Sequence, residues 1–255
     1  MGWLDDNRWW LARARERWSP RTSEPLTLRT WLASPIAWDS YNGITLEGAL
    51  QHAVVTLEAG HLPDDVFAGC PRDLSIEDGD IAIPISDERI EGHPIACSSW
   101  ARPSPGAVET TRYRRKRARI DAMPGEGKVI ISGGPFKSLN VPIPTVTTLY
   151  LDFHVRGDRE RLTDLLSRDA LVLGRWRSAG LGRVTGTEIL DDPEDRSLTW
   201  KGVPMRSLPV RDAADAERFK APYDLRPETT RAPYWHQRSM SLCVVPMQRL
   251  GDGEA

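Results

Sequence analysis

The spacing of hydrophobic residues predicts a strand followed by a helix in the first quarter of the chain. Residues 26–33 place Leu26, Leu28, Thr30 and Leu32 on one face, with the period of a half-buried strand. After a turn around Tyr41, Thr45 caps a helix that ends at Gly60. The core face of this helix consists of Leu46, Ala49, Leu50, Ala53, Val54 and Leu57.

A second strand–helix–strand unit lies later in the chain. Residues 149–155 alternate as a strand, Asp158 caps a helix, and a further strand covers about 184–190. The apolar positions of this helix are Leu162, Leu165 and Leu166. Short strand candidates at 80–85 and 93–98 stand between the two units. The order βαββαβ predicts an α+β fold of the ferredoxin-like class.

Three further segments complete the expected organisation. We expect a helical extension at 1–25, followed by one domain at 26–250. Residues 99–147 hold several prolines and glycines, a basic run and an apolar stretch, which predicts a long insertion that contains a hairpin. A proline-rich tail leads to a last strand at 241–245.

The extension carries an apolar stripe that is rich in tryptophan and ends at Ser19 and Pro20. At helical spacing the stripe consists of Trp3, Leu4, Trp10, Leu11, Ala14 and Trp18. Such a stripe usually packs on its own domain, and we favour that interpretation. Tryptophan is also enriched at interface hot spots, so docking on a partner stays open.

Positive charge is concentrated in one short segment. The chain has 255 residues and a net charge of −2, but six of the eight residues at 112–119 are basic and none is acidic. Since this segment carries +6, the remainder carries −8. A basic site on an acidic body fits a defined polyanion contact, with a merely solvated charged run as the alternative. Its basic residues are Arg112, Arg114, Arg115, Lys116, Arg117 and Arg119.

Cysteine usage and hydropathy argue against several protein classes. The cysteines Cys70, Cys97 and Cys243 lack the short spacing of a zinc cluster or a disulfide framework, so we expect a reducing cytoplasm. No apolar run approaches the roughly 20 residues of a membrane span. The acidic residues show no metal-ligand spacing. We therefore expect no cofactor and no membrane contact.

A glycine-rich loop at 174–186 carries the strongest functional signal. Gly180 and Gly182 permit positive φ, and their N–H groups are expected to approach a phosphate closely. The loop also presents Arg175, Arg177 and Arg183, which can form bidentate phosphate contacts. A dinucleotide-binding loop would follow a first strand and open a helix, whereas this loop follows a helix and opens a strand. A purely structural turn remains the alternative.

This pattern resembles the C-terminal signature of the CRISPR repeat-associated mysterious protein superfamily. The helix is followed by L-G-x-x-x-x-x-G-x-G-R-V, which starts at Leu173. Residues 33–37 and 44–50 are similar to the opening of the family, and 204–209 and 232–246 are similar to its tail segments. Together these segments resemble the small backbone subunit of type IV CRISPR systems over about residues 26–250. The extension at 1–25, and Ala232 where proline is expected, depart from the pattern.

The resemblance implies a non-catalytic subunit that caps the 5′ handle of the guide RNA (crRNA). Its partners would be the handle, the larger backbone subunits and the large subunit, with target DNA as a further candidate. The inserted hairpin would act as a thumb. The RNA-binding residues would be Arg112, Arg114, Arg115, Lys116, Arg117, Arg119, Lys137, Arg175, Arg177, Gly180, Gly182 and Arg183.

Three other functions are weighed against this one. A guide-RNA-processing endoribonuclease of the same superfamily is the main alternative, because His52 lies on the first helix near Tyr41 and could serve as general acid or base. A partly buried helix histidine is the more common explanation, and His236 is better suited to stacking. A small-molecule enzyme is disfavoured because His61 and His93 are isolated in the sequence. A plain protein-interaction module would not need the basic run.

Overall fold

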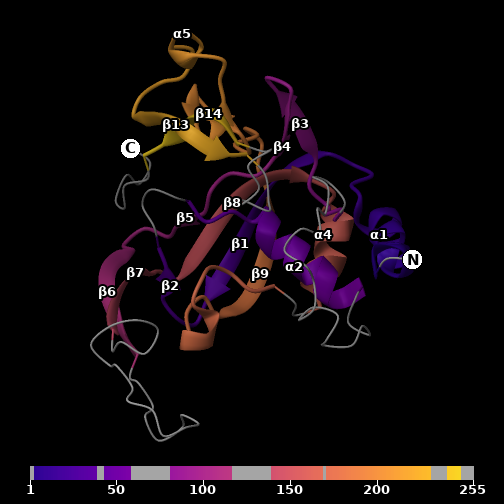
Figure 1. Cartoon of the computed structure of the whole chain (residues 1–255), viewed down its shortest axis with the longest axis horizontal. Helices are drawn as coiled ribbons and strands as arrows, with labels where there is room; N and C mark the ends of the chain where they lie inside the picture. The colour runs from indigo at the N-terminus through magenta and orange to yellow at the C-terminus, as the bar shows by residue number, and fades with distance from the viewer. Residues whose placement is uncertain are drawn as a thin grey trace, which may run out of the picture.

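A four-stranded antiparallel sheet forms the centre of the molecule (Figure 1). The structure, a computed structural model, describes residues 3–38, 43–58, 81–116, 139–168, 171–230 and 240–247, with the side chains of 3–9, 115, 116 and 139 left undescribed. The sheet order is β5 (Arg102–Pro103), β8 (Tyr150–Gly157), β1 (Glu24–Leu32) and β9 (Val184–Asp191).

Two helices complete a ferredoxin-like arrangement. In the chain, α2 (Glu47–Glu58) lies between β1 and β5, and α4 (Arg159–Leu166) lies between β8 and β9. Numbered along the chain, the strands of this sheet lie in the order second, third, first, fourth, and neighbouring strands are antiparallel. Each crossover therefore skips one strand, as in split βαβ units. The predicted α+β, ferredoxin-like class is confirmed.

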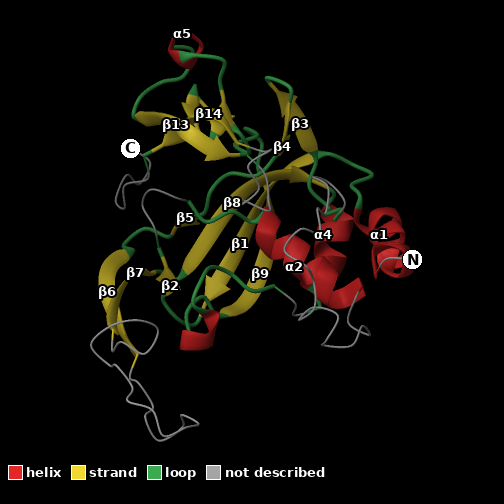
Figure 2. Ribbon diagram, in the orientation of Figure 1, coloured by secondary structure: helices red, strands yellow, loops and turns green. Residues whose placement is uncertain are grey.

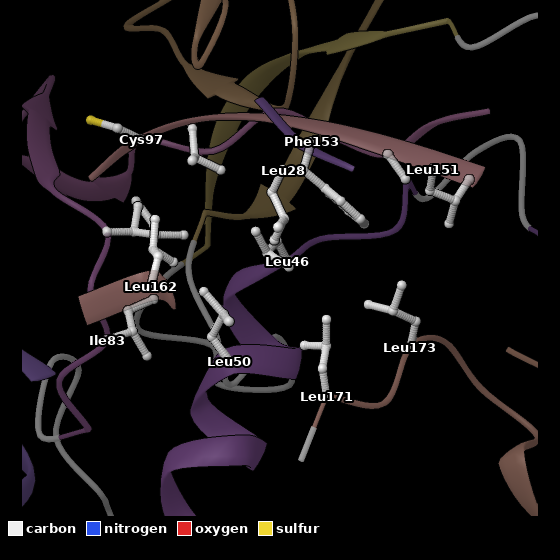
Figure 3. Close-up of a cluster of buried hydrophobic side chains, with 14 of the residues drawn as sticks. Leu28, Leu46, Leu50, Ile83, Cys97, Leu151, Phe153, Leu162, Leu171 and Leu173 are labelled. Carbon is white, nitrogen blue, oxygen red and sulfur yellow. The ribbon is translucent and has the colours of Figure 1, made fainter. Parts of the chain in front are cut away.

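The hydrophobic core lies between the sheet and these two helices (Figure 3). Alternation along β1 buries Leu26 and Leu28 on the helix side. Asp158 caps α4 as predicted, because its carboxylate accepts a hydrogen bond of 3.1 Å from the Arg161 backbone N–H. Other core residues from the sheet and helices are Leu50, Val54, Leu151, Phe153, Leu162 and Leu165.

The predicted strand at 80–85 is wrong. Ile83 and Ile85 are buried, but the segment meets the sheet only through a bridge from Ile85 to Gly157. Pro84 has no N–H to donate, which interrupts a ladder. A strand forms instead at β3 (Asp87–Ile90), which pairs with β4 (His93–Ala96). The predicted strand at 93–98 is thus confirmed as β4, but β5 takes the second-strand position in the main sheet.

The insertion forms a two-stranded arm at the lower left of Figure 1. Its strands are β6 (Val108–Lys116) and β7 (Leu139–Thr147), paired antiparallel from Val108 with Thr147 to Lys116 with Leu139. The short strand β2 (Ile36–Ala37) adds to the other edge of β7. The predicted hairpin is confirmed for the described strands, whereas the apolar stretch at 129–131 lies outside the described residues.

The N-terminal extension is a helix, α1 (Trp3–Trp18), that packs on the core. Trp10, Ala14 and Trp18 are buried, which confirms self-packing for this part of the stripe. The indole Nε1 of Trp18 donates a hydrogen bond of 2.9 Å to the buried carboxylate of Glu58 at the end of α2. The side chains of Trp3 and Leu4 lie outside the described ones.

The C-terminal segment forms a second sheet at the opposite end from the arm. Figure 2 shows α1, α2 and α4 gathered at the right, with this sheet at the upper left. Its strand order is β12 (Leu208–Pro209), β14 (Met240–Pro246) and β13 (Tyr223–Thr229). The predicted last strand corresponds to β14. Smaller elements are β10 (Thr199–Trp200), β11 (Val203–Pro204) and α5 (Ala213–Ala216). Among the described helices, none has both the length and the apolar character to cross a membrane.

Candidate nucleic-acid interface

The glycine-rich loop connects α4 to β9 through a series of left-handed residues. Gly174, Trp176, Gly180 and Gly182 have φ values of 72°, 62°, 79° and 68°. A turn of 3-10 helix, η3 (Arg177–Ala179), lies between them. Trp176 adopts a conformation that disfavours a bulky side chain, and such backbone strain persists only where the surroundings hold it.

The two glycines in the sequence motif have different roles. The Gly180 N–H donates to the Arg177 carbonyl at 2.9 Å, and the Gly182 N–H donates to the Pro35 carbonyl at 2.9 Å. Both N–H groups are therefore already bonded within the protein, and contact of either glycine with a phosphate stays a prediction. A Cβ at Gly182 would lie 2.2 Å from the Leu173 carbonyl oxygen, whereas one at Gly180 would meet open space. Gly182 fastens the loop to the domain, and Gly180 stands at its surface.

The arm and the glycine-rich loop touch through an arginine and a tryptophan. The guanidinium carbon of Arg114, on β6, lies 5.0 Å from the ring centroid of Trp176. This distance is within the range of a cation–π contact. Arg112 stands two residues earlier on β6 and so projects from the same face of the strand. Two basic segments about 60 positions apart in the sequence are thus brought together.

The arginines of this region are exposed and free of ion pairs. Within the described part of the chain, no carboxylate pairs with Arg112, Arg114, Arg175, Arg177 or Arg183. Several arginines elsewhere are paired, as Arg29 is with Asp152 at 2.8 Å. Unpaired guanidinium groups keep all their donors for an external acceptor, and their geometry suits phosphate. This surface can therefore take up a polyanion.

A cavity of about 720 Å³ opens beside this surface. Its lining combines the loop, β7, the start of α2 and the C-terminal segment. The apolar walls include Trp38, Trp100, Pro142, Ile143 and Pro144, and the charged or polar lining includes His52, Arg175, Arg177, Arg206 and Glu228. A volume in this range accommodates a ligand the size of a nucleotide, and apolar walls suit a base while arginines suit its phosphate.

His52 lines this cavity close to the loop. Burial lowers the pKa of His52, and the positive charge of Arg177 lowers it further. The imidazole is therefore neutral near pH 7, with one nitrogen that donates and one that accepts. The sequence placed His52 on a helix, but its proximity to Arg177 depends on the tertiary fold.

A buried ion pair between Arg206 and Glu47 lies at the wall of the cavity, which Arg206 helps to line. Arg206, on the C-terminal segment, donates to Glu47 at 3.2 Å and to the carbonyls of Ala96 at 2.6 Å and Thr230 at 3.0 Å. Both side chains are almost fully buried. The pair fixes the first turn of α2 against the tail that follows β11. The resemblance included Arg206 in a family segment, but only the fold reveals this role.

Several predicted site residues stay untested by the structure. Arg115 and Lys116 lie in β6, and their side chains are not described. Arg117, Arg119 and Lys137 lie outside the described residues, as do Tyr41 and His236. The residues that sequence reasoning missed are Trp176, Trp38 and Trp100. Tryptophans are common core residues, so their spacing gave no sign of a shared cavity.

Comparison with known families identifies a match to most of the second half of the chain. Residues 100–246, more than half of the chain, match the family model described as "CRISPR type IV associated protein Csf3". The matched segment contains β6, β7, the glycine-rich loop, Arg206 and β14. A search of curated proteins finds no match. The family match confirms the resemblance to type IV CRISPR proteins.

Proposed function

Because the chain belongs to the Csf3 family of type IV CRISPR-associated proteins, we propose that it is a non-catalytic effector subunit that binds and caps the 5′ handle of the guide RNA. In this role it meets the larger backbone subunits and the large subunit, and helps to assemble the complex that base-pairs with target DNA. Base pairing by the guide then supplies the sequence specificity, as in other RNA-guided effectors.

The convergence of unpaired arginines around the cavity carries this proposal. Arg112 and Arg114 come from the arm, and Arg175, Arg177 and Arg183 come from the loop. Binding single-stranded RNA requires cations along the backbone and apolar surfaces for unstacked bases. The cavity supplies the second requirement within reach of Arg175 and Arg177, which line it.

RNA affinity measured as a function of salt tests the proposal. The probe is a synthetic RNA with the repeat-derived handle of the protein's own CRISPR locus. Each phosphate contact with a single strand contributes about 0.7 to the slope of log K against log salt. Replacing Arg114, Arg175 and Arg177 with alanine should therefore weaken binding and flatten the slope by about 2. The matched control is Arg211→Ala, which removes an exposed arginine paired with Glu91. An unchanged slope in the triple variant contradicts the proposal.

The guide-RNA-processing endoribonuclease is the second candidate, because His52 lines the same cavity as two arginines. Metal-free cleavage needs a base for the 2′-hydroxyl, an acid for the leaving oxygen and cationic support. A neutral His52 and the arginines supply part of that set. Incubating the protein with repeat RNA decides between the functions. A specific cut that disappears in His52→Ala favours the nuclease, and RNA that is bound but not shortened favours the structural role.

A further inference from the structure

The face of the central sheet opposite the helices carries an aromatic platform at its exposed end, next to the glycine-rich loop, whereas Thr27 and His154 farther along this face are buried. Trp31 on β1 and Tyr150 on β8 are directly paired and project from the face opposite the helices. Their ring centroids lie 5.2 Å apart with an interplanar angle of 69°. Trp31 is 39% exposed, an unusual fraction for a tryptophan in a central strand.

The neighbouring side chains hold Tyr150 and leave Trp31 accessible. The guanidinium of Arg29 lies 3.9 Å above the Tyr150 ring and forms two hydrogen bonds of 2.8 Å with Asp152. One face of Tyr150 is therefore covered. On the other side of β1, the residue opposite Trp31 is Gly186, which has no side chain to cover the indole.

The backbone next to Trp31 is irregular. The register with β9 changes from Trp31 opposite Gly186 to Leu32 opposite Val184, which leaves Thr185 unpaired as a bulge. The Thr185 hydroxyl donates to the Trp31 carbonyl at 3.3 Å. Bulges redirect side chains and are enriched at functional sites.

We propose that Trp31 stacks a nucleobase of single-stranded RNA, which makes this platform a second RNA contact beyond the cavity. The inference rests on the proposed RNA-binding function. Aromatic residues on the two central strands of a ferredoxin-like sheet are the usual stacking positions of RNA-recognition modules. Here the central strands are β1 and β8, and each contributes one ring.

The surrounding charges favour RNA as the occupant. Asp152 is neutralised by Arg29, and Arg102 stands opposite Asp152 on β5. Among the described residues, Glu188 is then the remaining acid of the strand pair beside Trp31. The unpaired Arg183 lies close by, since its carbonyl accepts from the Ala33 N–H at 2.9 Å. Ala33 is two residues beyond Trp31, so the two residues lie about 7 Å apart along the strand. This distance equals the rise of roughly two stacked nucleotides. A strand that contacts the loop can thus continue onto Trp31.

The test measures handle-RNA affinity with Trp31→Leu and Trp31→Phe in the full-length protein. Stacking on one base contributes about 1–3 kcal/mol, so Trp31→Leu should weaken binding at least fivefold without changing the salt slope. Trp31→Phe should restore most of the affinity, since phenylalanine keeps a stacking face. The matched control is Trp200→Leu, a half-buried tryptophan in β10. Circular dichroism checks that each variant is folded.

RNAs with one abasic nucleotide identify the stacked position. The loss of RNA affinity caused by Trp31→Leu should vanish with the RNA that lacks the stacked base and persist with the other abasic RNAs. The comparison is a double-mutant cycle between the protein and the RNA. Equal losses with every RNA, or no loss at all, overturn the inference. So does a Trp31→Leu protein that keeps RNA and loses its protein partners in co-purification. If the wild-type protein does not bind handle RNA, the proposed function fails, whereas arginine-dependent binding that ignores Trp31 refutes this inference alone.

Discussion

The guanidinium carbon of Arg114 lies 5.0 Å from the ring centroid of Trp176, and this contact joins the inserted arm to the glycine-rich loop. Both side chains come from segments that the sequence linked to RNA binding, but their contact required the folded chain. It places a basic residue of the arm beside the arginines of the loop, so the two segments share one basic surface.

Removing this contact should reduce RNA binding more than removing one charge would. We expect Arg114→Ala to lower the salt slope by about 0.7 and Trp176→Gly to reduce affinity by displacing the arm. Glycine at position 176 accepts the positive φ, so the second change adds no backbone strain. In a double-mutant cycle on RNA affinity, the coupling should be about 0.5–1 kcal/mol, typical of an exposed cation–π pair. Fully additive effects would show that the contact is incidental.

The two loop glycines should respond differently to alanine. A Cβ at Gly182 would lie 2.2 Å from a carbonyl oxygen, so Gly182→Ala must displace the backbone of the loop and should lower stability by several kcal/mol. Gly180→Ala meets no neighbour and should lose only about 1 kcal/mol, from its positive φ. Urea unfolding measures both. Equal stabilities of the two variants would refute the structural role of Gly182.

The ferredoxin-like core was predictable from sequence because its strands and helices are long and periodic. Alternation marked β1 and β8, and Asp158 marked the start of α4. The second-strand position was not predictable, because Arg102 and Pro103 form only two ladder pairs and carry no alternation. Local pattern favours Ile83 and Ile85 instead, although Pro84 between them lacks the N–H that a ladder needs.

The candidate site was predictable in its charges and not in its geometry. Arginines are visible in the sequence, but whether one is free depends on the carboxylates that the fold brings near. Arg29 and Arg206 look like available cations and are held by Asp152 and Glu47. Likewise, hydrogen bonds of the Gly182 backbone to Pro35 depend on tertiary contact.

The N-terminal helix should contribute measurably to stability through Trp18. Its indole is fully buried and donates to Glu58, whose carboxylate also pairs with Arg17 at 3.3 Å. Trp18→Phe keeps most of the apolar contact but removes the donor, so it should cost about 1–3 kcal/mol. Trp18→Ala should cost about 3–5 kcal/mol, because it adds a cavity. Thermal unfolding of both variants provides the measurement, with the exposed Arg15→Ala as the control. A harmless Trp18→Ala would mean that the helix does not pack on the core.

The buried Arg206–Glu47 pair should be sensitive to the loss of either partner. Arg206→Met leaves the Glu47 carboxylate buried without a cation, which costs about 3–5 kcal/mol. Adding Glu47→Leu should recover part of this loss, because no unpaired charge then remains. Recovery should be incomplete, since the carbonyls of Ala96 and Thr230 each lose the hydrogen bond that Arg206 donates. Denaturant midpoints of the single and double variants test this order, and a double variant less stable than both singles would contradict it.

His154 should make stability depend on pH below neutrality. Its ring is buried, and its Nδ1 lies 2.9 Å from the Thr27 hydroxyl and 3.3 Å from Asp192. Burial, together with the positive charge of Arg196, lowers the pKa of His154 to about 4, and the negative charge of Asp192 opposes this shift.

Between pH 6.5 and 4 the unfolded chain therefore binds a proton at His154 that the folded protein does not. The contribution of the neutral His154 to the free energy of unfolding is fully present above pH 6.5. It decreases by about 3 kcal/mol as the pH falls to about 4. The matched variant His154→Gln keeps a polar side chain and lacks the titration. Urea unfolding at a series of pH values should show the difference in unfolding free energy between wild type and variant shrinking as the pH falls through this window. The substitution leaves groups that do not contact His154 unchanged, so the difference reports on His154 and its immediate surroundings. A difference that stays constant from pH 7 to 4 would show that the pKa of the imidazole is the same in the folded and the unfolded protein.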